Sequence, residues 1–222
     1  MQQPVLNLAQ VHPTDAAHHT FARVITKDEF AGLQGVPFRL MTADLVSVLV
    51  LDLPDGIIPL QSSSVERFGG WDHLYAVGVD NLAHLDLFDA EHHGDENCAF
   101  TAVSGPTKLT ASLMLTGADR IAAISGAAPG EDGYLFVVPH PGLFAFSVIR
   151  DRSAIPAMKA LLRFAAHEFS QAEEKLSPHL FWQRGERIEQ LSLLEGGGAL
   201  SIAFSEDYRA VLDRVAAQKP RA

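Results

Sequence analysis

The segment from Val46 to Phe88 constrains the fold most, because it predicts a strand, a turn and a helix in close succession. Its first part, Val46 to Leu53, is an apolar run of the kind that forms a buried strand. The run stops at Pro54-Asp55-Gly56, whose residues favour a tight turn. A helix is then predicted from Asp72 to about Leu87, because residues on one face recur at helical spacing: Leu74, Gly78, Leu82 and Leu85.

Elsewhere in the chain, strand patterns occur in clusters that helices interrupt, rather than in strict alternation with helices. Strands are predicted over 21–25, 38–41, 45–53, 98–103, 109–115, 134–138, 143–149, 180–183, 187–194 and 200–204. Further helices are predicted after Thr26, after Ser63, over 118–124, after Ser153 as the capping residue, and after Ser205. The pattern favours an α+β fold in which an antiparallel-rich mixed sheet packs against the two main amphipathic helices, which begin near Asp72 and Arg152. We expect a single domain over residues 21–222, preceded by a loosely ordered arm over residues 1–20.

Length and composition indicate an ordinary globular protein. The chain has 222 residues, of which 47% are hydrophobic and 20% charged, and no Pro/Ser/Gly-rich linker divides it. The N-terminal residues lack the basic and apolar regions of a secretory signal. The longest apolar stretch, 134–149, contains Pro139 and Pro141 and is too short to cross a bilayer. A single cysteine, Cys98, fits a reducing compartment, so we expect a cytoplasmic protein with no membrane attachment.

The net charge of −10, from 17 basic and 27 acidic side chains, narrows the class of partner. Affinity for nucleic acid comes largely from cationic side chains that neutralise phosphates, so we expect no nucleic-acid partner. A negative surface would instead accelerate encounter with a basic protein. The simpler interpretation is that the charge serves solubility alone.

Several short motifs resemble the YtpQ-like family of bacterial proteins of unknown function. They are, in order, Leu49 to Asp55, Val79 to Leu82, Ala111 to Leu115, Gly133 to His140, Leu180 to Trp182 and Arg184 to Glu186. The similarity covers roughly residues 38–195. It implies a shared architecture, but no activity or catalytic set is established for that family, so it implies no chemistry.

An acidic segment is the first candidate for a binding site. Five carboxylates fall within one short span that contains no Lys or Arg, and we expect them on an exposed loop: Asp86, Asp89, Glu91, Asp95 and Glu96. Such a cluster is tolerated when it is solvated or when it meets a cationic surface. It is therefore the predicted contact with a basic partner, although a solvated loop explains it equally well.

Four residues form a candidate metal site. Asp80 and His84 are four positions apart and share one face of a helix, and His92 and His93 follow in the acidic segment. Imidazole and carboxylate groups are ligands for zinc and similar ions. No His-Glu-x-x-His or paired-cysteine spacing supports this assignment, and adjacent histidines point in different directions. His140 is a further candidate general base, provided that a carboxylate or a nucleophile lies near it.

These observations predict a non-catalytic binding module whose acidic face recognises a basic protein, with no cofactor. An immunity or inhibitor protein for a basic toxin domain is one concrete form of this prediction. The alternative is a metal-assisted hydrolase that uses Asp80, His84 and His92 or His93.

Overall fold

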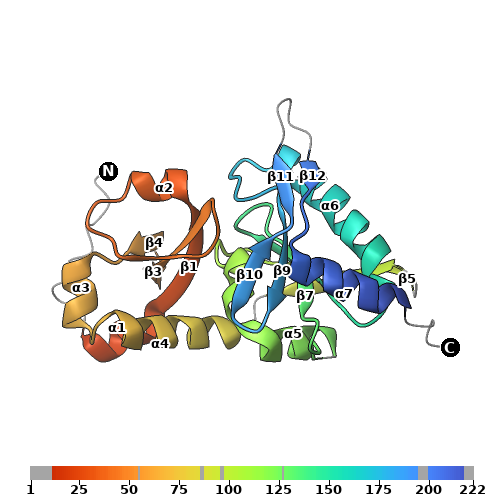
Figure 1. Ribbon diagram of the computed structural model, residues 1–222. Helices are drawn as coiled ribbons and strands as arrows, with labels where there is room; N and C mark the ends of the chain where they lie inside the picture. The colour runs from red at the N-terminus through yellow and green to blue at the C-terminus, as the bar shows by residue number, and fades with distance from the viewer. Residues whose placement is uncertain are drawn as a thin grey trace.

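Two antiparallel sheets, one from each half of the chain, form the framework of the protein (Figure 1). The computed structural model describes residues 12–54, 56–85, 88–95, 98–126, 128–194 and 200–217. The predicted α+β class is confirmed. Among the described strands every pair is antiparallel, and the strands belong to two main sheets and a small ribbon instead of the one mixed sheet expected.

The first sheet is built around a buried central strand. Its members are β1 (Thr20–Thr26), β2 (Phe38–Leu40), β3 (Leu45–Leu53) and β4 (Gly56–Pro59). Strand β3 pairs with β1 on one side and with β2 and then β4 on the other. Helix α4 (Trp71–Ala83) covers one face with Leu74, Gly78 and Leu82 buried, as the helical spacing predicted. Three short helices complete this half: α1 (Pro13–His19), α2 (Lys27–Ala31) and α3 (Ser62–Arg67).

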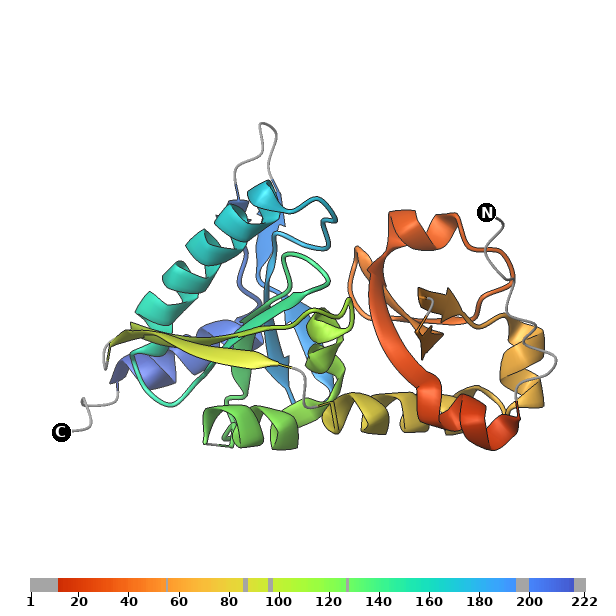
Figure 2. The same ribbon diagram turned by 180° about the vertical axis from the view of Figure 1, so that it is seen from behind.

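The second sheet has six strands in the order β10-β9-β7-β8-β6-β5. Their bounds are β5 (Asp89–Asp95), β6 (Cys98–Ser104), β7 (Tyr134–Val137), β8 (Leu143–Val148), β9 (Leu180–Arg184) and β10 (Arg187–Gln190). Helices α6 (Ala154–Gln171) and α7 (Glu206–Ala217) lie on one face of this sheet (Figure 2). Leu161, Trp182 and Tyr208 belong to the buried cluster between these helices and the sheet. The 3-10 helix η2 (Thr110–Leu115) and helix α5 (Gly117–Ser125) pack on the other face. Strands β11 (Ser192–Leu194) and β12 (Leu200–Ile202) form the separate ribbon.

Helix η2 joins the two halves. One buried apolar cluster contains Val24 and Leu45 from the first sheet, Leu113 from η2, and Phe136 from the second sheet. The backbone amide of Val24 donates a 2.9 Å hydrogen bond to the Ser112 hydroxyl oxygen. Because η2 contacts both sheets with a continuous apolar surface, the two halves share one core.

Two of the local predictions above are wrong, and a third is correct only in position. The segment 109–115, expected to be a strand, forms η2, because a short apolar run that is buried on all sides has no distinguishing period. Part of the expected loose arm forms α1, and Ala16 on this helix is buried. Helix α6 begins directly after Ser153, as predicted, but the Ser153 side chain makes no capping bond. Instead the Asp151 carboxylate accepts from the Ser153 amide.

Candidate functional site

The acidic segment is largely a strand and not the loop that was expected. Asp89, Glu91 and Asp95 lie on β5, the edge strand of the six-stranded sheet. Asp89 and Glu91 are exposed, the side chain of Asp95 is not among those described, and Asp86 and Glu96 lie outside the described residues. Charged side chains on an edge strand also discourage pairing with a second chain. The acidic residues of β5 therefore have a structural explanation that needs no partner.

The four candidate metal ligands are not brought together. His84 Nδ1 lies 3.6 Å from Asp80 Oδ2 at the C-terminal end of α4, and both side chains are exposed. His92 and His93 are neighbours in β5 and point to opposite faces of the sheet. His92 Nδ1 is 2.9 Å from Thr101 Oγ1, whereas His93 stacks on the Phe100 ring. Within the described residues, no three His, Cys, Asp or Glu side chains are arranged to hold a metal ion.

His140 lies in a shallow surface hollow of about 390 Å³. Its Nε2 is 3.9 Å from Glu168 Oε2, so the carboxylate that a general base would need is near. Burial lowers the pKa of His140, and the Glu168 carboxylate partly opposes this effect. The hydroxyl that lines this hollow belongs to Thr107, whose Oγ1 already accepts the Leu109 amide. The hollow therefore contains a His140–Glu168 pair, but its hydroxyl, that of Thr107, is already engaged by the Leu109 backbone amide.

A larger cleft of about 900 Å³ opens between the two halves of the molecule. Its walls come from β2, from α4, from η2 with α5, and from the β9–β10 hairpin. The apolar part of the lining includes Tyr75, Val79, Met114, Leu115 and Ile188. Because no single element provides this surface, the cleft exists only once both sheets are packed against η2.

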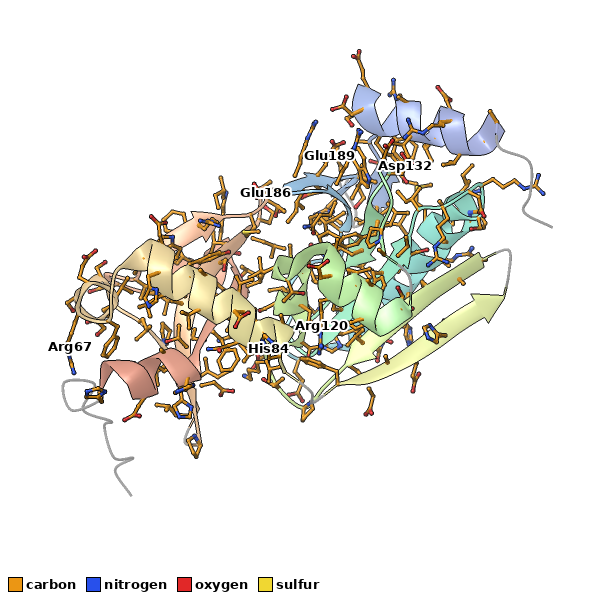
Figure 3. The ribbon with its side chains drawn as sticks, turned by 90° about the horizontal axis from the view of Figure 1, so that it is seen from below. Arg67, His84, Arg120, Asp132, Glu186 and Glu189 are labelled. Atoms are coloured by element: carbon orange, nitrogen blue, oxygen red, sulfur yellow. The ribbon has the colours of Figure 1, made fainter. Side chains whose placement is uncertain are left out.

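The charged groups of the cleft are three carboxylates and two guanidinium groups. Asp80, Asp119 and Glu186 are exposed, and none of the described lysines or arginines forms an ion pair with them. Both arginines are engaged within the protein. The Arg39 guanidinium lies 4.1 Å from the centre of the Tyr75 ring. Arg120 donates to the Leu85 carbonyl, beside His84 at the end of α4 (Figure 3). Of the three carboxylates, Asp80 has His84 as a neighbour on its own helix, and all three are exposed to solvent.

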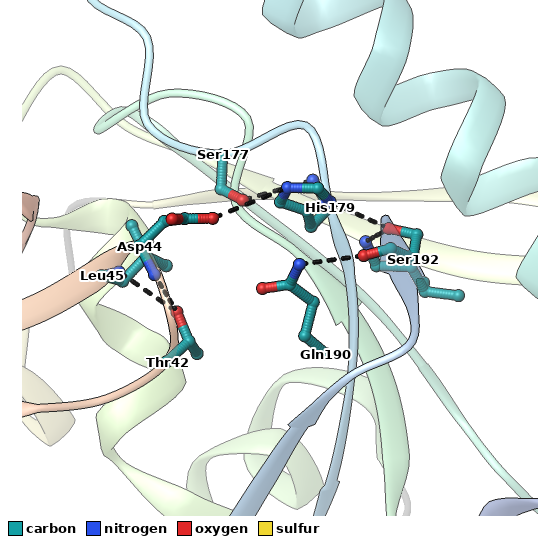
Figure 4. A network of polar contacts seen from close by, with 8 residues as sticks. Thr42, Asp44, Leu45, Ser177, His179, Gln190 and Ser192 are labelled. Carbon is teal, nitrogen blue, oxygen red and sulfur yellow. Dashed lines mark hydrogen bonds and ion pairs between the residues drawn. The ribbon is translucent and has the colours of Figure 1, made fainter. Parts of the chain in front are cut away.

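A second cleft, of about 610 Å³, lies between α2, the C-terminal end of α6 and the β11–β12 ribbon. At its base, a polar network connects the β2–β3 loop to the second half (Figure 4). His179 Nε2 is 3.8 Å from Asp44 Oδ2, and His179 Nδ1 is 3.2 Å from Ser192 Oγ. Burial lowers the pKa of His179, while the Asp44 carboxylate and the hydrogen bond with Ser192 oppose the shift.

The Asp44, His179 and Ser192 side chains have the composition of a catalytic triad but not its properties. A nucleophilic hydroxyl must reach substrate, whereas Ser192 is fully buried and its Oγ accepts the Leu180 amide at 3.0 Å. The separation of 3.8 Å between His179 and Asp44 is also longer than a hydrogen bond. Through His179 and Asp44, this network connects one half of the molecule to the other.

Reasoning from the sequence found only one residue of the larger cleft, Asp80, and placed it in a metal site. Arg39, Tyr75, Arg120 and Glu186 were missed, because each lies on a different element and no local spacing connects them. The turn at Arg184 to Glu186 was the one available signal, since it places Glu186 at an exposed hairpin tip.

Comparisons with known proteins identify no relative. No protein-family model, curated protein or solved structure matches the chain. The resemblance to the YtpQ-like family stays a prediction. Among the described residues, no helix combines the length and apolar character that crossing a membrane requires.

Proposed function

We propose that this protein is a binding module that holds a basic segment of a partner protein in the 900 Å³ cleft between its two halves. One observation supports the proposal most: the lining of the cleft combines apolar side chains with three exposed carboxylates, Asp80, Asp119 and Glu186. An apolar centre with a charged rim is the usual arrangement of protein-binding surfaces. The carboxylates would attract lysine or arginine side chains, and the apolar part of the lining would receive apolar ones.

The net charge of −10 acts in the same direction. An acidic surface accelerates encounter with a basic partner, and the carboxylates of the cleft would then orient the bound segment. An immunity or inhibitor protein that blocks a basic toxin domain is a concrete form of this function. We place the encounter in the cytoplasm, because a chain with a single cysteine suits a reducing compartment.

The cleft is a stronger candidate than β5 for the contact. Asp89 and Glu91 are exposed, but they stand on an edge strand where charge is useful without any partner. The cleft carboxylates adjoin apolar side chains that remain partly open to solvent, such as Val79 and Leu115. The combination of charge and accessible apolar surface favours recognition.

Site-specific crosslinking in the native cell tests the proposal. A photo-reactive amino acid at Ala83 lies in the cleft, and the same group at Ala90 on β5 is the matched control. We expect Ala83, and not Ala90, to capture a protein with a basic segment. With that protein purified, D80N/D119N/E186Q should slow association about tenfold or more at low salt, whereas D89N/E91Q should change it little.

Two outcomes would contradict this proposal. Capture from Ala90 alone, with association slowed only by D89N/E91Q, would move the binding surface to β5. Absence of a specific crosslink from both positions would remove the binding module as the function.

A further inference from the structure

Strand β2 presents an unpaired backbone edge on the side away from β3. The Met41 amide donates to the Leu45 carbonyl at 3.1 Å, and Leu40 lies opposite Val46. In an antiparallel ladder, bonded and non-bonded pairs alternate, so the backbone of Arg39 faces β3. The N–H and C=O groups of Phe38 and Leu40 therefore point outward. Among the described strands, none pairs with β2 at this edge.

The cleft borders this edge. Arg39 points toward α4, where its guanidinium lies over the Tyr75 ring. Leu40 belongs to the opposite face, together with Phe38, whose ring centre is 4.5 Å from that of Phe30 on α2. Both Arg39 and Leu40 line the cleft. Because Arg39 and Leu40 belong to opposite faces, the cleft reaches around the C-terminal end of β2, where the outward backbone groups of Leu40 lie.

The side chains around this edge differ between its two sides. On the side away from α4, Phe38 and Leu40 are 49% and 59% exposed and lie two residues apart on one face of β2. On the α4 side, the Arg39 guanidinium lies over the Tyr75 ring, and Asp80 contributes a carboxylate that is 71% exposed. An extended chain lying along β2 would turn alternate side chains toward these two environments.

We propose that the partner segment binds as an added β-strand on β2, with apolar and basic side chains in alternation. Its backbone pairs with the outward groups of Phe38 and Leu40, its apolar side chains cover those two residues, and its lysines or arginines face Asp80. This mode of recognition combines backbone hydrogen bonds for affinity with alternate side-chain contacts for specificity. The inference rests on the proposed function, since it describes how the same cleft holds its partner.

The opposite wall of the cleft also ends in a strand edge. In the β9–β10 hairpin, Arg187 lies opposite Arg184 and the Leu191 amide donates to Leu180, so the backbone of Ile188 points outward. Beside it, the Arg187 side chain is occupied by ion pairs with Asp207 and Glu189. Exposed apolar residues that an added strand could cover lie on β2 and not on β10.

The experiment uses the whole protein and a displayed library of octapeptides in which Lys or Arg alternates with apolar residues. Binders are selected, and amide hydrogen exchange of the labelled protein is measured by NMR with and without saturating peptide. We expect exchange at Phe38 and Leu40 to slow about tenfold or more. The Arg39 amide, which already faces β3, is the internal control and should not change.

A pair of variants at Leu40 separates the backbone from the side chain. L40P removes the outward N–H at an edge position where proline is tolerated, and L40A retains it. We expect L40P to weaken peptide binding about tenfold or more relative to L40A. If L40P fails to fold, the exchange measurement on the unmodified protein still decides the question.

Each remaining outcome overturns the strand-addition proposal. Protection at Ile188 in place of Phe38 and Leu40 would assign the added strand to β10. Selected peptides that bind in an Asp80-dependent way without protecting any edge amide would show that the cleft binds side chains only, and the proposed function would stand. A library without binders would reject strand addition, while crosslinking from Ala83 would still test the proposed function separately.

Discussion

Gly78 shows how one residue determines the distance between a helix and a sheet. A Cβ at this position would lie 2.7 Å from the Ala22 nitrogen and 2.9 Å from the Phe21 carbonyl carbon, both in the backbone of β1. Helix α4 can approach the first sheet this closely only because the residue at the contact has no side chain. The same helix carries Asp80 and Tyr75, which line the cleft, so the position of α4 against the sheet also determines where these two residues lie.

Replacing Gly78 with alanine should lower the free energy of unfolding by about 1–3 kcal/mol, because the backbone of β1 cannot yield without moving the sheet. The gain in helix propensity, about 1 kcal/mol, offsets this cost only in part. Urea denaturation measures the change. Gly130→Ala is the matched control, since a Cβ there has no neighbour within 4 Å, and it should be neutral or slightly stabilising. Equal stability of the two variants would show that α4 is not limited by this contact.

At the scale of elements, the outer strands of the two sheets differ in how their free edges are covered. The outer edge of β1 is covered by η2, where the Ser112 hydroxyl accepts the Val24 amide. The outer edge of β5 carries Asp89 and Glu91, whose charges oppose pairing with another chain. Strand β2 is short and displays apolar side chains beside the cleft. This contrast is the reason for regarding β2 as the edge that accepts a partner.

Replacing Ser112 with alanine should destabilise the protein by about 1–3 kcal/mol, because it leaves the buried amide of Val24 without its acceptor. The measurement is again urea denaturation, with Ser170→Ala as the control. Ser170 is exposed and its hydroxyl donates to the His167 carbonyl, so its loss should change stability by less than about 0.5 kcal/mol. A Ser112 variant as stable as this control would mean that η2 holds β1 through apolar contact alone.

At the scale of the whole molecule, an apolar cluster and a polar network connect the two halves. The shared apolar cluster around η2 is the larger one. The second is the network in which His179 from one half faces Asp44 from the other (Figure 4). Burial favours the neutral form of His179, so this network depends on pH.

Stability should therefore fall as the pH drops from about 7.5 to about 5.5. The pKa values of His179 and His140 are lowered in the folded state, chiefly by burial. On acidification the unfolded chain, with its ordinary histidine pKa near 6.5, binds protons before the folded protein does. The stability contributed by the neutral histidines is complete above about pH 6.5 and is lost toward the folded pKa. Urea denaturation across this range should show that the free energy of unfolding falls with decreasing pH, and H140Q/H179Q should reduce the slope of this dependence. An unchanged slope in that variant would assign the pH dependence to other groups.

The sequence predicted most elements because their signals are local. The apolar run of β3, the face of α4 and the hairpin at Arg184 to Glu186 each lie within one contiguous segment. The helix predicted after Thr26 was also placed correctly, and the Thr26 hydroxyl caps it by accepting the Glu29 amide three residues later. The prediction failed for Leu109 to Leu115, where burial on every side removed the period that separates a strand from a helix.

The sequence by itself determined the α+β class, the amphipathic helices and the acidic character of the surface, because periodicity and charge are properties of neighbouring residues. Only the tertiary structure decided that the strands divide into two sheets and that Asp80, Asp119 and Glu186 surround one cleft. These three carboxylates come from α4, α5 and the β9–β10 turn. Their proximity depends on how both sheets pack against η2, which no local pattern in the chain encodes.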